Sequence, residues 1–383
     1  MPTATKWLRM CGLSGLGALT VGCGGGNPTP TLACNPSSTP ELAYVLSGTT
    51  TPWGNGTISA FTVDSCTGAL TATTPATIAT GSAPEDFAVD PSGRFVYAAN
   101  LVSNAADLAT ISMYTISPST GGLTATTPAT VATGFLPQGI GVDPAGRFVY
   151  TANSDDNSVS MFTIDSNTGL LKPSTPPFVL AGQSPNSVAV HPSGMYAYVT
   201  NEGDQTVSMY NINRSTGVLT PMTPATVPAG SSPFEVIVDP SGKFAYVPNA
   251  TDPRGVSQYA IDPSTGILTP VTPNFVRAGN EPTSVAVAPL SKFAYIVNRQ
   301  DNTVSAYMID PATGNLTLIG IYAAGATPWR IAVDPSGKFA YVGNENGRSV
   351  SAYRINEDGS LVLVETTPTP GPAFAIAIVL PKQ

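Results

Sequence analysis

Charged side chains that could act on a carbonyl compound occur at equivalent positions along this sequence. Each of these positions follows a proline at the end of a short segment that contains Gly or Ser. Glu85, Asp86, Glu235 and Arg330 all lie within two residues of such a proline. A carboxylate can take a proton from water as a general base, and an arginine can stabilise the oxyanion that forms when hydroxide attacks. These four residues are therefore the candidate catalytic residues.

The equivalent positions in the other repeats predict a rim of polar and aromatic residues. If the repeats surround a channel, the residues after each linking proline enter the innermost strands and line one end of it. The candidate ligand-binding residues of this rim are Gln138, Asn186, Thr283, Trp329, Arg330 and Phe374. Arg330 could hold a carboxylate through two hydrogen bonds, with Trp329 as a stacking surface. Alternatively, these polar groups only satisfy one another around a water-filled channel.

Other kinds of chemistry lack the residues that they need. The one histidine, His191, replaces Asp in a His-Pro-Ser-Gly turn, which we expect at the opposite end of the channel. No spaced set of His and Cys residues is present, and the run Asp155-Asp156-Asn157 is too short for a calcium loop. We therefore expect no metal and no cofactor.

A tyrosine preceded by small or apolar residues recurs along the chain and indicates the fold. The seven copies are separated by 53, 53, 48, 48, 49 and 46 residues and are Tyr44, Tyr97, Tyr150, Tyr198, Tyr246, Tyr295 and Tyr341. In the unit that begins at 184, alternating segments at 186–190, 195–201, 206–212 and from 218 are separated by Pro- and Gly-rich turns or polar loops. The pattern predicts an all-β protein, a seven-bladed β-propeller with four strands per blade.

The two ends of the repeat region are expected to complete one blade. The first unit begins at Glu41 with the second strand of the pattern, and residues 372–380 have the pattern of an innermost strand with no sequel. Pairing of the C-terminal strand with the N-terminal blade would remove two open sheet edges, which otherwise invite aggregation. The propeller is therefore predicted to close through this pairing.

Two smaller motifs repeat with the blades, and we interpret both as structural. The Asp-Pro-Ser-Gly motif and its Asp-Pro-Ala-Gly variant favour a tight reversal and begin at Asp90, Asp143, Asp239 and Asp334. An asparagine follows the second strand of six units and is expected to cap a loop, at Asn100, Asn153, Asn201, Asn249, Asn298 and Asn344.

The charge balance excludes one class of partner. The chain has 16 Lys and Arg residues against 24 Asp and Glu residues, a formal net charge of −8. Binding to a phosphate backbone needs clusters of Lys and Arg, which are absent here. We expect no nucleic-acid partner.

The N-terminal residues predict export. Residues 1–22 have a basic start followed by an apolar stretch too short for a comfortable membrane span, as in a signal peptide. The segment 19–23 resembles a bacterial lipoprotein signal, with Thr20 where Leu is usual and Cys23 as the lipid attachment site. Residues 23–40 are predicted to be a flexible tether, and 41–383 the propeller. The protein is thus expected in the bacterial cell envelope, periplasmic or at the cell surface, touching the membrane only through its lipid.

Two further cysteines are predicted to form a disulfide. Cys11 leaves with the signal peptide and Cys23 carries the lipid, so Cys34 and Cys66 are left as a pair in an oxidising compartment. Cys66 lies in a Ser-Thr-Gly-type turn of the first blade, on the side where the tether is expected to enter. The bond would fix the tether to that blade.

The repeats resemble a known family. Residues 198–201 spell Tyr-Val-Thr-Asn, and Val-Asp-Pro-Ser-Gly-Lys-Phe-Ala-Tyr-Val occurs at 238–247 and again at 333–342. Together with Ile-Asp-Pro-Ser-Thr-Gly at 261–266, these segments look like those of the lactonase-type, YVTN-repeat seven-bladed propellers, which include bacterial 6-phosphogluconolactonase. The resemblance covers 41–380 and implies the fold more directly than the reaction, because the motifs specify turns and blades.

Two functions follow from these patterns, and whether the protein is an enzyme is left open between them. We favour a monomeric, non-catalytic propeller that binds a glycan, a small sugar acid or a protein partner at its rim, because this rim has one predicted Arg and no His. The alternative, which the resemblance implies, is a lactonase that hydrolyses a sugar-acid lactone. In that case Glu235, Glu85 or Asp86 would activate water and Arg330 would stabilise the oxyanion.

Overall fold

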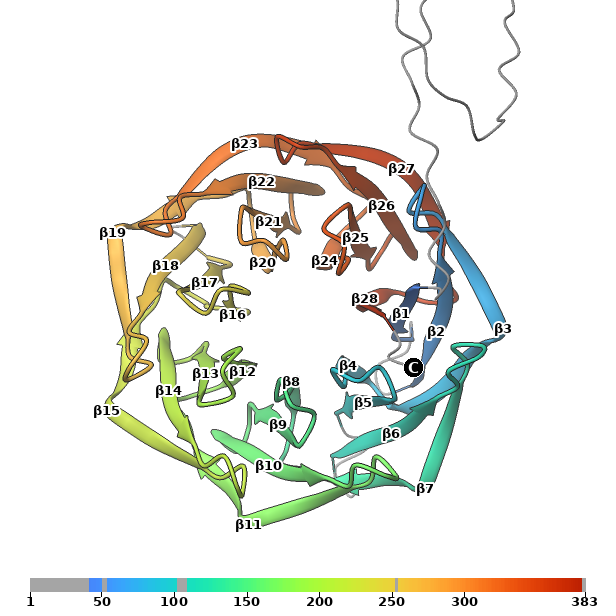
Figure 1. Ribbon diagram of the computed structural model, residues 1–383, viewed down its shortest axis with the longest axis horizontal. Helices are drawn as coiled ribbons and strands as arrows, with labels where there is room; N and C mark the ends of the chain where they lie inside the picture. The colour runs from blue at the N-terminus through green and yellow to red at the C-terminus, as the bar shows by residue number, and fades with distance from the viewer. Residues whose placement is uncertain (1–40, 50–53, 102–108, 252–253, 381–383) are drawn as a thin grey trace, which may run out of the picture. The chain divides into compact units, whose positions relative to one another are not determined.

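The chain folds into a ring of β-sheets. In this computed structural model, the described residues are 41–49, 54–101, 109–251 and 254–380, and all belong to the unit Pro36–Gln383. They form seven four-stranded antiparallel sheets arranged around a centre, and none of them is helical (Figure 1). The predicted all-β, seven-bladed propeller with four strands per blade is confirmed. No helix in this described part is long and apolar enough to cross a membrane.

Each blade contributes one strand to each of four concentric positions. The innermost strands are β4 (Pro84–Val89), β8 (Pro137–Val142), β12 (Pro185–Val190), β16 (Ile237–Val238), β20 (Pro282–Val287), β24 (Pro328–Val333) and β28 (Ala373–Val379). The second strands are β1 (Glu41–Ser47), β5 (Phe95–Asn100), β9 (Phe148–Asn153), β13 (Tyr196–Asn201), β17 (Phe244–Asn249), β21 (Phe293–Asn298) and β25 (Phe339–Asn344).

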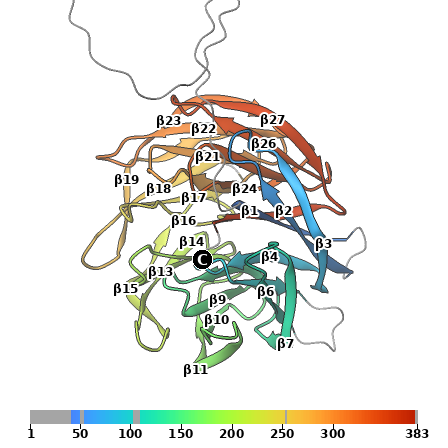
Figure 2. The same ribbon diagram turned by 45° about the vertical axis from the view of Figure 1, so that its right-hand side comes forward.

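The two outer positions complete the blades, and the turned view shows the outermost strands on the outside of the ring (Figure 2). The third strands are β2 (Asn55–Val63), β6 (Thr110–Ile116), β10 (Ser158–Ile164), β14 (Thr206–Ile212), β18 (Gly255–Ile261), β22 (Thr303–Ile309) and β26 (Ser349–Ile355). The outermost strands are β3 (Leu70–Ser82), β7 (Leu123–Ala132), β11 (Leu171–Leu180), β15 (Leu219–Pro228), β19 (Leu268–Arg277), β23 (Leu316–Ala323) and β27 (Leu361–Pro368).

The first blade is closed by the C-terminal strand, as predicted. Strand β28 pairs with β1 in antiparallel register, with Val45 opposite Ile376 and Leu42 opposite Val379. The sheet order is therefore β28-β1-β2-β3, so one blade joins the start of the propeller to its end. Strand β1 thereby becomes an interior strand of its sheet and has no open edge.

The repeated tyrosines link each blade to the next. Each buried Tyr hydroxyl donates a hydrogen bond of 2.7–3.2 Å to a glycine carbonyl in the turn between the third and fourth strands of the following blade. The pairs are Tyr44–Gly121, Tyr97–Gly169, Tyr150–Gly217, Tyr198–Gly266, Tyr246–Gly314, Tyr295–Gly359 and Tyr341–Gly68. The last pair joins blade seven back to blade one. The recurring tyrosine in the sequence is therefore the donor of a closed circuit of bonds between blades.

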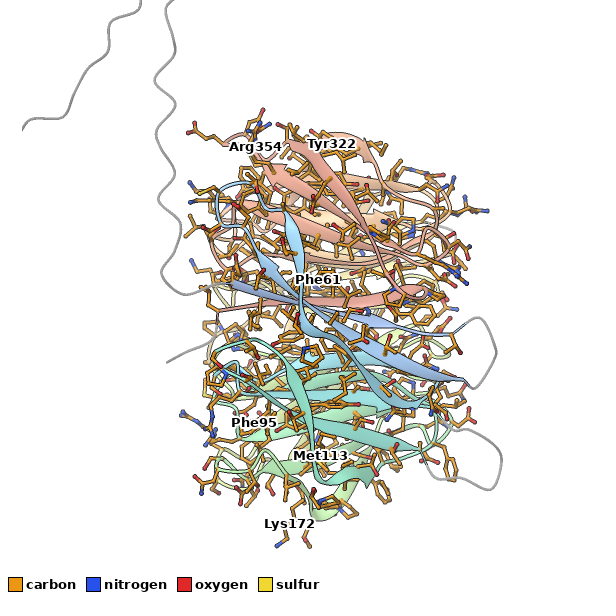
Figure 3. All side chains as sticks on the ribbon, turned by 90° about the vertical axis from the view of Figure 1, so that its right-hand side faces the viewer. Phe61, Phe95, Met113, Lys172, Tyr322 and Arg354 are labelled. Atoms are coloured by element: carbon orange, nitrogen blue, oxygen red, sulfur yellow. The ribbon has the colours of Figure 1, made fainter. Side chains whose placement is uncertain are left out.

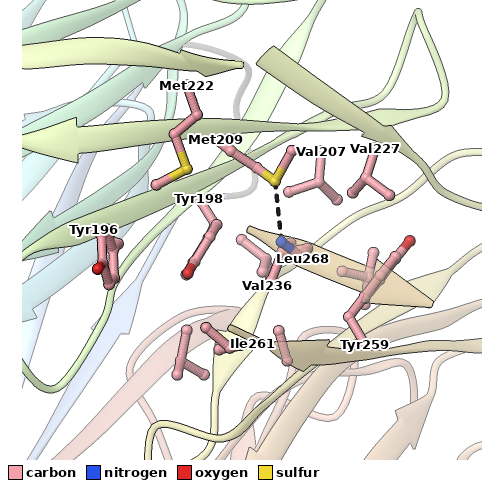
Figure 4. Close-up of a cluster of buried hydrophobic side chains, with 13 residues drawn as sticks. Tyr196, Tyr198, Val207, Met209, Met222, Val227, Val236, Tyr259, Ile261 and Leu268 are labelled. Atoms are coloured by element: carbon pink, nitrogen blue, oxygen red, sulfur yellow. Dashed lines mark hydrogen bonds between the residues drawn. The ribbon is translucent and has the colours of Figure 1, made fainter. Parts of the chain in front are cut away.

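Apolar side chains fill the space between neighbouring blades. In the cluster of Figure 4, Tyr198 and Met209 of blade four pack with Val236 and Leu268 of blade five. The Met209 sulfur also accepts a hydrogen bond of 3.3 Å from the Leu268 amide. Seen edge-on, buried Phe61 and Met113 lie among the strands while Lys172 and Arg354 extend from the surface (Figure 3). The core is thus a series of layers between sheets.

The repeated Asn and Asp residues are structural, as interpreted. Asn201, fully buried, donates from Nδ2 to Thr206 and Ser208 and accepts the Gly182 amide, so it joins three segments. A Cβ at Gly182 would lie only 2.6 Å from Asn201 Cγ, so glycine is required there. Asp239 accepts the amides of its own Asp-Pro-Ser-Gly turn and of the strand that follows it. These residues therefore hold loops and turns in place.

The innermost strand of blade five is shorter than the pattern predicts. Strand β16 has only two residues, and before it Pro233 makes an isolated bridge with Asn249. Phe234 donates its amide to Pro248, 3.0 Å away, while Glu235 stands outside the regular ladder. The other innermost strands have six or seven residues. Glu235 is thereby free to point away from its own blade.

Loss of one hydroxyl of the tyrosine circuit should weaken the fold. Tyr198→Phe leaves the Gly266 carbonyl buried without a partner, which should reduce the free energy of unfolding by about 1–3 kcal/mol. Urea unfolding followed by fluorescence measures the change. Tyr322→Phe, at a partly buried tyrosine outside the circuit, is the control and should change stability by less than about 0.5 kcal/mol. Equal effects of the two substitutions would contradict the role given to the circuit.

Glu41 should make stability depend on pH. The residue is 5% exposed, its Oε1 has no hydrogen-bond partner, and burial together with the nearby Asp334 raises its pKa from 4.5 to about 7. Because the folded-state pKa lies above the unfolded value, this group makes the protein lose stability as pH rises from about 4.5 to about 7.

Glu41→Gln should therefore flatten part of that decline. The variant should gain up to about 3 kcal/mol over the native protein at pH 8 and little at pH 4.5. Urea unfolding at a series of pH values tests this, with the exposed Glu357→Gln as the control. A gain that is the same at both ends of the pH range would be inconsistent with this assignment.

Candidate functional site

Three of the four candidate catalytic residues meet in ion pairs that cross the centre of the ring. Arg330, on β24 of blade seven, lies 2.8 Å from Glu235 of blade five and 3.4 Å from Asp86, on β4 of blade two. The three side chains are only 11–16% exposed. Because none of these blades is adjacent to another, the cluster bridges the channel at its axis. The proline-linked positions identified from the sequence do converge.

A β-bulge explains how two consecutive residues can both reach the rim. In regular strands, successive side chains point to opposite faces. The pairing of β4 with β5 shifts between Pro84 and Asp86, which leaves Glu85 unpaired, and β8, β12, β20 and β24 have the same shift. Bulges of this kind re-aim a side chain and are common near active sites. The two residues after each linking proline therefore face the rim for a physical reason that the sequence pattern alone does not reveal.

The second residue after the proline also ties blades together around the channel. Its side chain accepts the amide of the third residue after the proline in the following blade at four of the seven joins. The pairs are Asp86–Ile140 (3.2 Å), Ser187–Val236 (3.4 Å), Glu235–Val285 (2.9 Å) and Ser284–Ile331 (3.3 Å). Asp86 and Glu235 thus bind both Arg330 and a backbone amide of the following blade. Their carboxylate oxygens therefore already have protein partners in the absence of a ligand.

Electrostatics in this cluster depend on burial and on Arg330. Burial raises the pKa of Asp86, and this outweighs the opposing effects of Arg330 and of the Ile140 amide. Burial alone would lower the pKa of Arg330, but its carboxylate neighbours outweigh it and the pKa lies above its usual value. Arg330 is therefore a permanent cation in the channel.

Glu85 differs from its neighbours because its carboxylate is uncommitted. Among the described residues, no hydrogen bond or ion pair engages this partly buried side chain. Burial raises its pKa from 4.5 to about 7, opposed by Arg330 and reinforced by the charges of Asp86 and Glu345. A general base works best when its pKa is near the working pH. Of the three candidate acids, Glu85 is the one suited to exchange a proton with water.

The aromatic rim residues pack together beside the cluster. Trp329 makes edge-to-face contacts with Phe234 and Phe374, with ring centroids 5.4 and 6.2 Å apart. The Arg299 guanidinium lies 4.5 Å from the centre of the Trp329 ring, so it occupies one stacking position. Thr283 donates to the Trp329 carbonyl, 2.9 Å away. The expected stacking surface for a ligand is therefore partly covered by the protein itself.

Arg299 is the functional-site residue that the sequence analysis missed. It follows β21 directly and forms ion pairs with Glu281, at 2.7 Å, and with Glu345, at 2.9 Å. The rim thus has a second arginine, which lies over Trp329, contrary to the predicted count of one. The residue after each repeated asparagine begins a loop on the same rim, and reading those positions would have found Arg299, Glu202 and Glu345.

The remaining rim predictions lie on the other side of the ring. Asn186 is buried and donates to Glu202, 3.2 Å away, and Gln138 is partly buried on the adjacent blade. Glu202 and Ser232 border a shallow polar hollow of about 550 Å³. Hollows of about 400 and 480 Å³ also occur at the outer strands of blades three and five, far from the charged cluster. On this side of the channel, Asn186 and Ser232 both donate to Glu202.

His191 and Cys66 lie in turns outside this site. His191 accepts the Ser193 amide at Nδ1, so Nε2 carries the proton and donates to the Gly242 carbonyl, 2.9 Å away. It is a turn residue, as predicted. Cys66 is disulfide-bonded, but Cys34, like Cys23 and the signal peptide, is outside the described residues, so the pairing stays a prediction. Within the described ranges, no group of three His, Cys, Asp or Glu side chains could hold a metal ion.

Comparison with known families decides the relationship of the chain. The model of the lactonase, seven-bladed β-propeller family matches residues 43–128, 108–184, 178–274 and 269–377. The chain belongs to this family. No curated protein matches the sequence of this lactonase-family propeller.

Solved structures similar to this lactonase-family propeller share its fold. A Bacteroides uniformis protein provisionally named a 6-phosphogluconolactonase is 21% identical, with a TM-score of 0.75 over 88% of this chain and 99% of its own. The periplasmic gluconolactonase PpgL of Pseudomonas aeruginosa is also 21% identical, with a TM-score of 0.71 over 88% and 99%. A Lactobacillus plantarum protein is 21% identical, with a TM-score of 0.74 over 89% and 99%.

The favoured interpretation of a non-catalytic binding propeller is wrong. The lactonase family match extends over 43–377 and supports the alternative, a lactonase. The argument against catalysis rested on a rim with a single arginine and no histidine, and Arg299, which lies over the rim residue Trp329, supplies a second arginine. The expected scarcity of charge on this rim came from reading only the proline-linked positions.

Removal of the central cation should destabilise the fold in a pH-dependent way. Arg330→Gln leaves Glu85, Asp86 and Glu235 without a countercharge, which should lower stability by about 3–5 kcal/mol at pH 8. The loss should be smaller at pH 5, because the folded-state pKa values of these acids rise further and the neutral forms are then available. Thermal melting at both pH values measures this, with the exposed Lys292→Gln as the control. A loss independent of pH would contradict the electrostatic role of Arg330.

Proposed function

We propose that this protein hydrolyses the lactone of a sugar acid at the rim of its channel. The observation that carries the proposal is the position of an uncommitted carboxylate, Glu85, beside the fixed cation Arg330 in a member of the lactonase family. Hydrolysis of a cyclic ester requires both parts: a base for the attacking water and a positive group for the carbonyl oxygen.

The reaction can be followed through the side chains present. Glu85 removes a proton from a water molecule as its oxygen attacks the lactone carbonyl carbon, and the carbonyl electron pair moves onto the carbonyl oxygen. Arg330 stabilises that negative oxygen. When the tetrahedral intermediate collapses, the ring C–O bond breaks and the protonated Glu85 returns its proton to the departing alkoxide. The product is the open-chain sugar acid.

Asp86 and Glu235 are assigned positioning roles. Each forms an ion pair with Arg330 and also holds a backbone amide of the next blade, so they fix the guanidinium in the channel. One Arg330 N–H donates to Glu235 and the other terminal nitrogen forms an ion pair with Asp86, and since each terminal nitrogen carries two N–H groups we assign a remaining one to a single substrate oxygen. A group that is held in place before the reaction needs no reorganisation when the oxyanion forms.

The substrate class and the cellular location are proposed on different grounds. The names of the Bacteroides uniformis and Pseudomonas aeruginosa neighbours both point to sugar lactones for those proteins, and we extend that class to this chain. A location in the cell envelope, with Cys23 lipidated, is proposed from the sequence of residues 1–23. Trp329 and the polar hollow near Glu202 are proposed as contacts for the sugar hydroxyls, and the protein is proposed to act as a monomer.

The pH dependence of turnover should reveal the base. With D-glucono-1,5-lactone as substrate and spontaneous hydrolysis subtracted, kcat/KM should rise with pH and level off above about 7, because Glu85 must be ionised to accept a proton. Glu85→Gln should lower kcat by about 10²–10⁴-fold and remove this rise.

A matched substitution separates this effect from a structural one. Glu357→Gln removes the same charge from an exposed turn at the opposite end of the channel, and it should keep the kcat and the pH profile of the native protein. An unaltered kcat in Glu85→Gln would exclude Glu85 as the base. Absence of turnover by the native protein with gluconolactone, galactonolactone and their 6-phosphates would exclude the proposed function as a whole.

A further inference from the structure

The arginines beside the channel mouth are outnumbered by carboxylates that contact them. Arg330 is paired with Asp86 and Glu235, and Arg299 is paired with Glu281 and Glu345. Glu85 adds a further carboxylate near Arg330. Five acids therefore surround two cations, and because four of these acids remain when Glu85 is protonated, the negative groups outnumber the positive ones in either state of Glu85.

Neither arginine is arranged to receive a phosphate group. Recognition of a phosphate by arginine uses two parallel N–H donors of a guanidinium that faces the ligand. The two terminal nitrogens of Arg299 are held by Glu281 and Glu345, its plane lies over Trp329, and its Nε is buried without a partner. The two terminal nitrogens of Arg330 are likewise each held by a carboxylate.

Other cations near this rim offer little compensation. Of the described lysines, Lys243, Lys292 and Lys338 lie in turns at the opposite end of the channel, and Lys172 is the second residue of the outermost strand β11. Arg254 and Arg348 lie in loops on the rim face but are exposed, where water and salt weaken their interactions. A dianionic substituent would therefore enter a region whose nearest cations are already neutralised.

We propose that this site selects lactones without a charged substituent and discriminates against phosphorylated ones, with Glu281 and Glu345 as the residues that determine this specificity. The inference rests on the proposed function for its substrate class, and on the ion pairs of Arg299 for its direction. The same field favours departure of the product, because ring opening converts an uncharged lactone into a carboxylate. The carboxylates thus repel a phosphorylated substrate before the reaction and the negatively charged product after it.

The test compares an uncharged ring with its phosphate in both binding and turnover. Binding is measured by calorimetry with 1,5-anhydroglucitol and 1,5-anhydroglucitol 6-phosphate, which have the pyranose ring and cannot be hydrolysed. Turnover is measured with D-glucono-1,5-lactone and its 6-phosphate. We expect at least a tenfold preference for the uncharged member of each pair, which should narrow as salt rises from about 0.02 to about 0.5 M.

Substitutions in the Arg299 ion pairs should shift the preference. Glu281→Gln and Glu345→Gln each release one terminal nitrogen of Arg299 and remove a negative charge, so each should strengthen binding of the phosphorylated ring several-fold relative to the uncharged one. Glu357→Gln removes the same charge from an exposed turn at the opposite end of the channel and should leave the ratio unchanged. Equal shifts in all three variants would show a general charge effect and overturn the assignment to Glu281 and Glu345.

The outcomes for the two proposals are distinct. Equal or tighter binding of the phosphate by the native protein would overturn the inference, whether or not either lactone is hydrolysed. A tenfold binding preference without any turnover would uphold the charge selection and overturn the proposed hydrolysis. If neither ring binds and neither lactone is hydrolysed, both proposals fail.

Discussion

Hydrogen bonds from buried tyrosines to the turns of neighbouring blades are the constraint on which the ring depends. A propeller blade is a small sheet that cannot bury its own faces, so its stability comes from the adjacent blades. The seven Tyr-to-Gly bonds place each second strand at a set distance from the following blade, and the last bond returns to the first blade. Because the bonds form a closed circuit, the spacing of every blade depends on that of all the others. The position of the channel-lining strands follows from this spacing.

The geometry of the candidate site depends on the blade positions that these hydrogen bonds set. Arg330, Asp86 and Glu235 come from three blades that are not neighbours in the ring, yet their side chains meet within hydrogen-bond or ion-pair distance. The same carboxylates accept amides of neighbouring innermost strands, so the charges of the site are also part of the architecture. Of the three acids beside Arg330, Glu85 is the one whose side chain has no hydrogen bond or ion pair among the described residues. Its protonation can therefore change during a reaction without breaking a contact that holds the ring together.

Sequence reasoning succeeded where a residue repeats, and failed where it does not. Tyr198, Asn201 and the Asp-Pro-Ser-Gly turn at Asp239 occur in many copies, so their spacing disclosed the blades, the strand order and the closure. The proline-linked positions also located Arg330 with Asp86 and Glu235, because a repeated join places equivalent residues at one rim. Arg299 was missed although it follows a repeated asparagine, because an arginine does not repeat there and its importance depends on its contacts with Glu281, Glu345 and Trp329. The shortened β16 was equally invisible, since its apolar residues continue the pattern of a full strand. The functional interpretation erred for the same reason: a count of charges along one set of positions does not measure the charge of a surface.

Because the first blade contains the C-terminal strand β28, it can be completed only after the whole propeller has been translated. The ribosome produces β1, β2 and β3 first, but the sheet to which they belong lacks its innermost member until the last strand has emerged. Six blades are made in between, and each can form its local hairpins as soon as its residues are available. The nascent chain therefore carries an unfinished edge on its earliest blade throughout elongation, and the ring becomes a single cooperative body only after translation of the final strand. A shortened product of premature termination would expose β1 together with the facing side of blade seven, which would make such fragments ready targets for quality-control proteases.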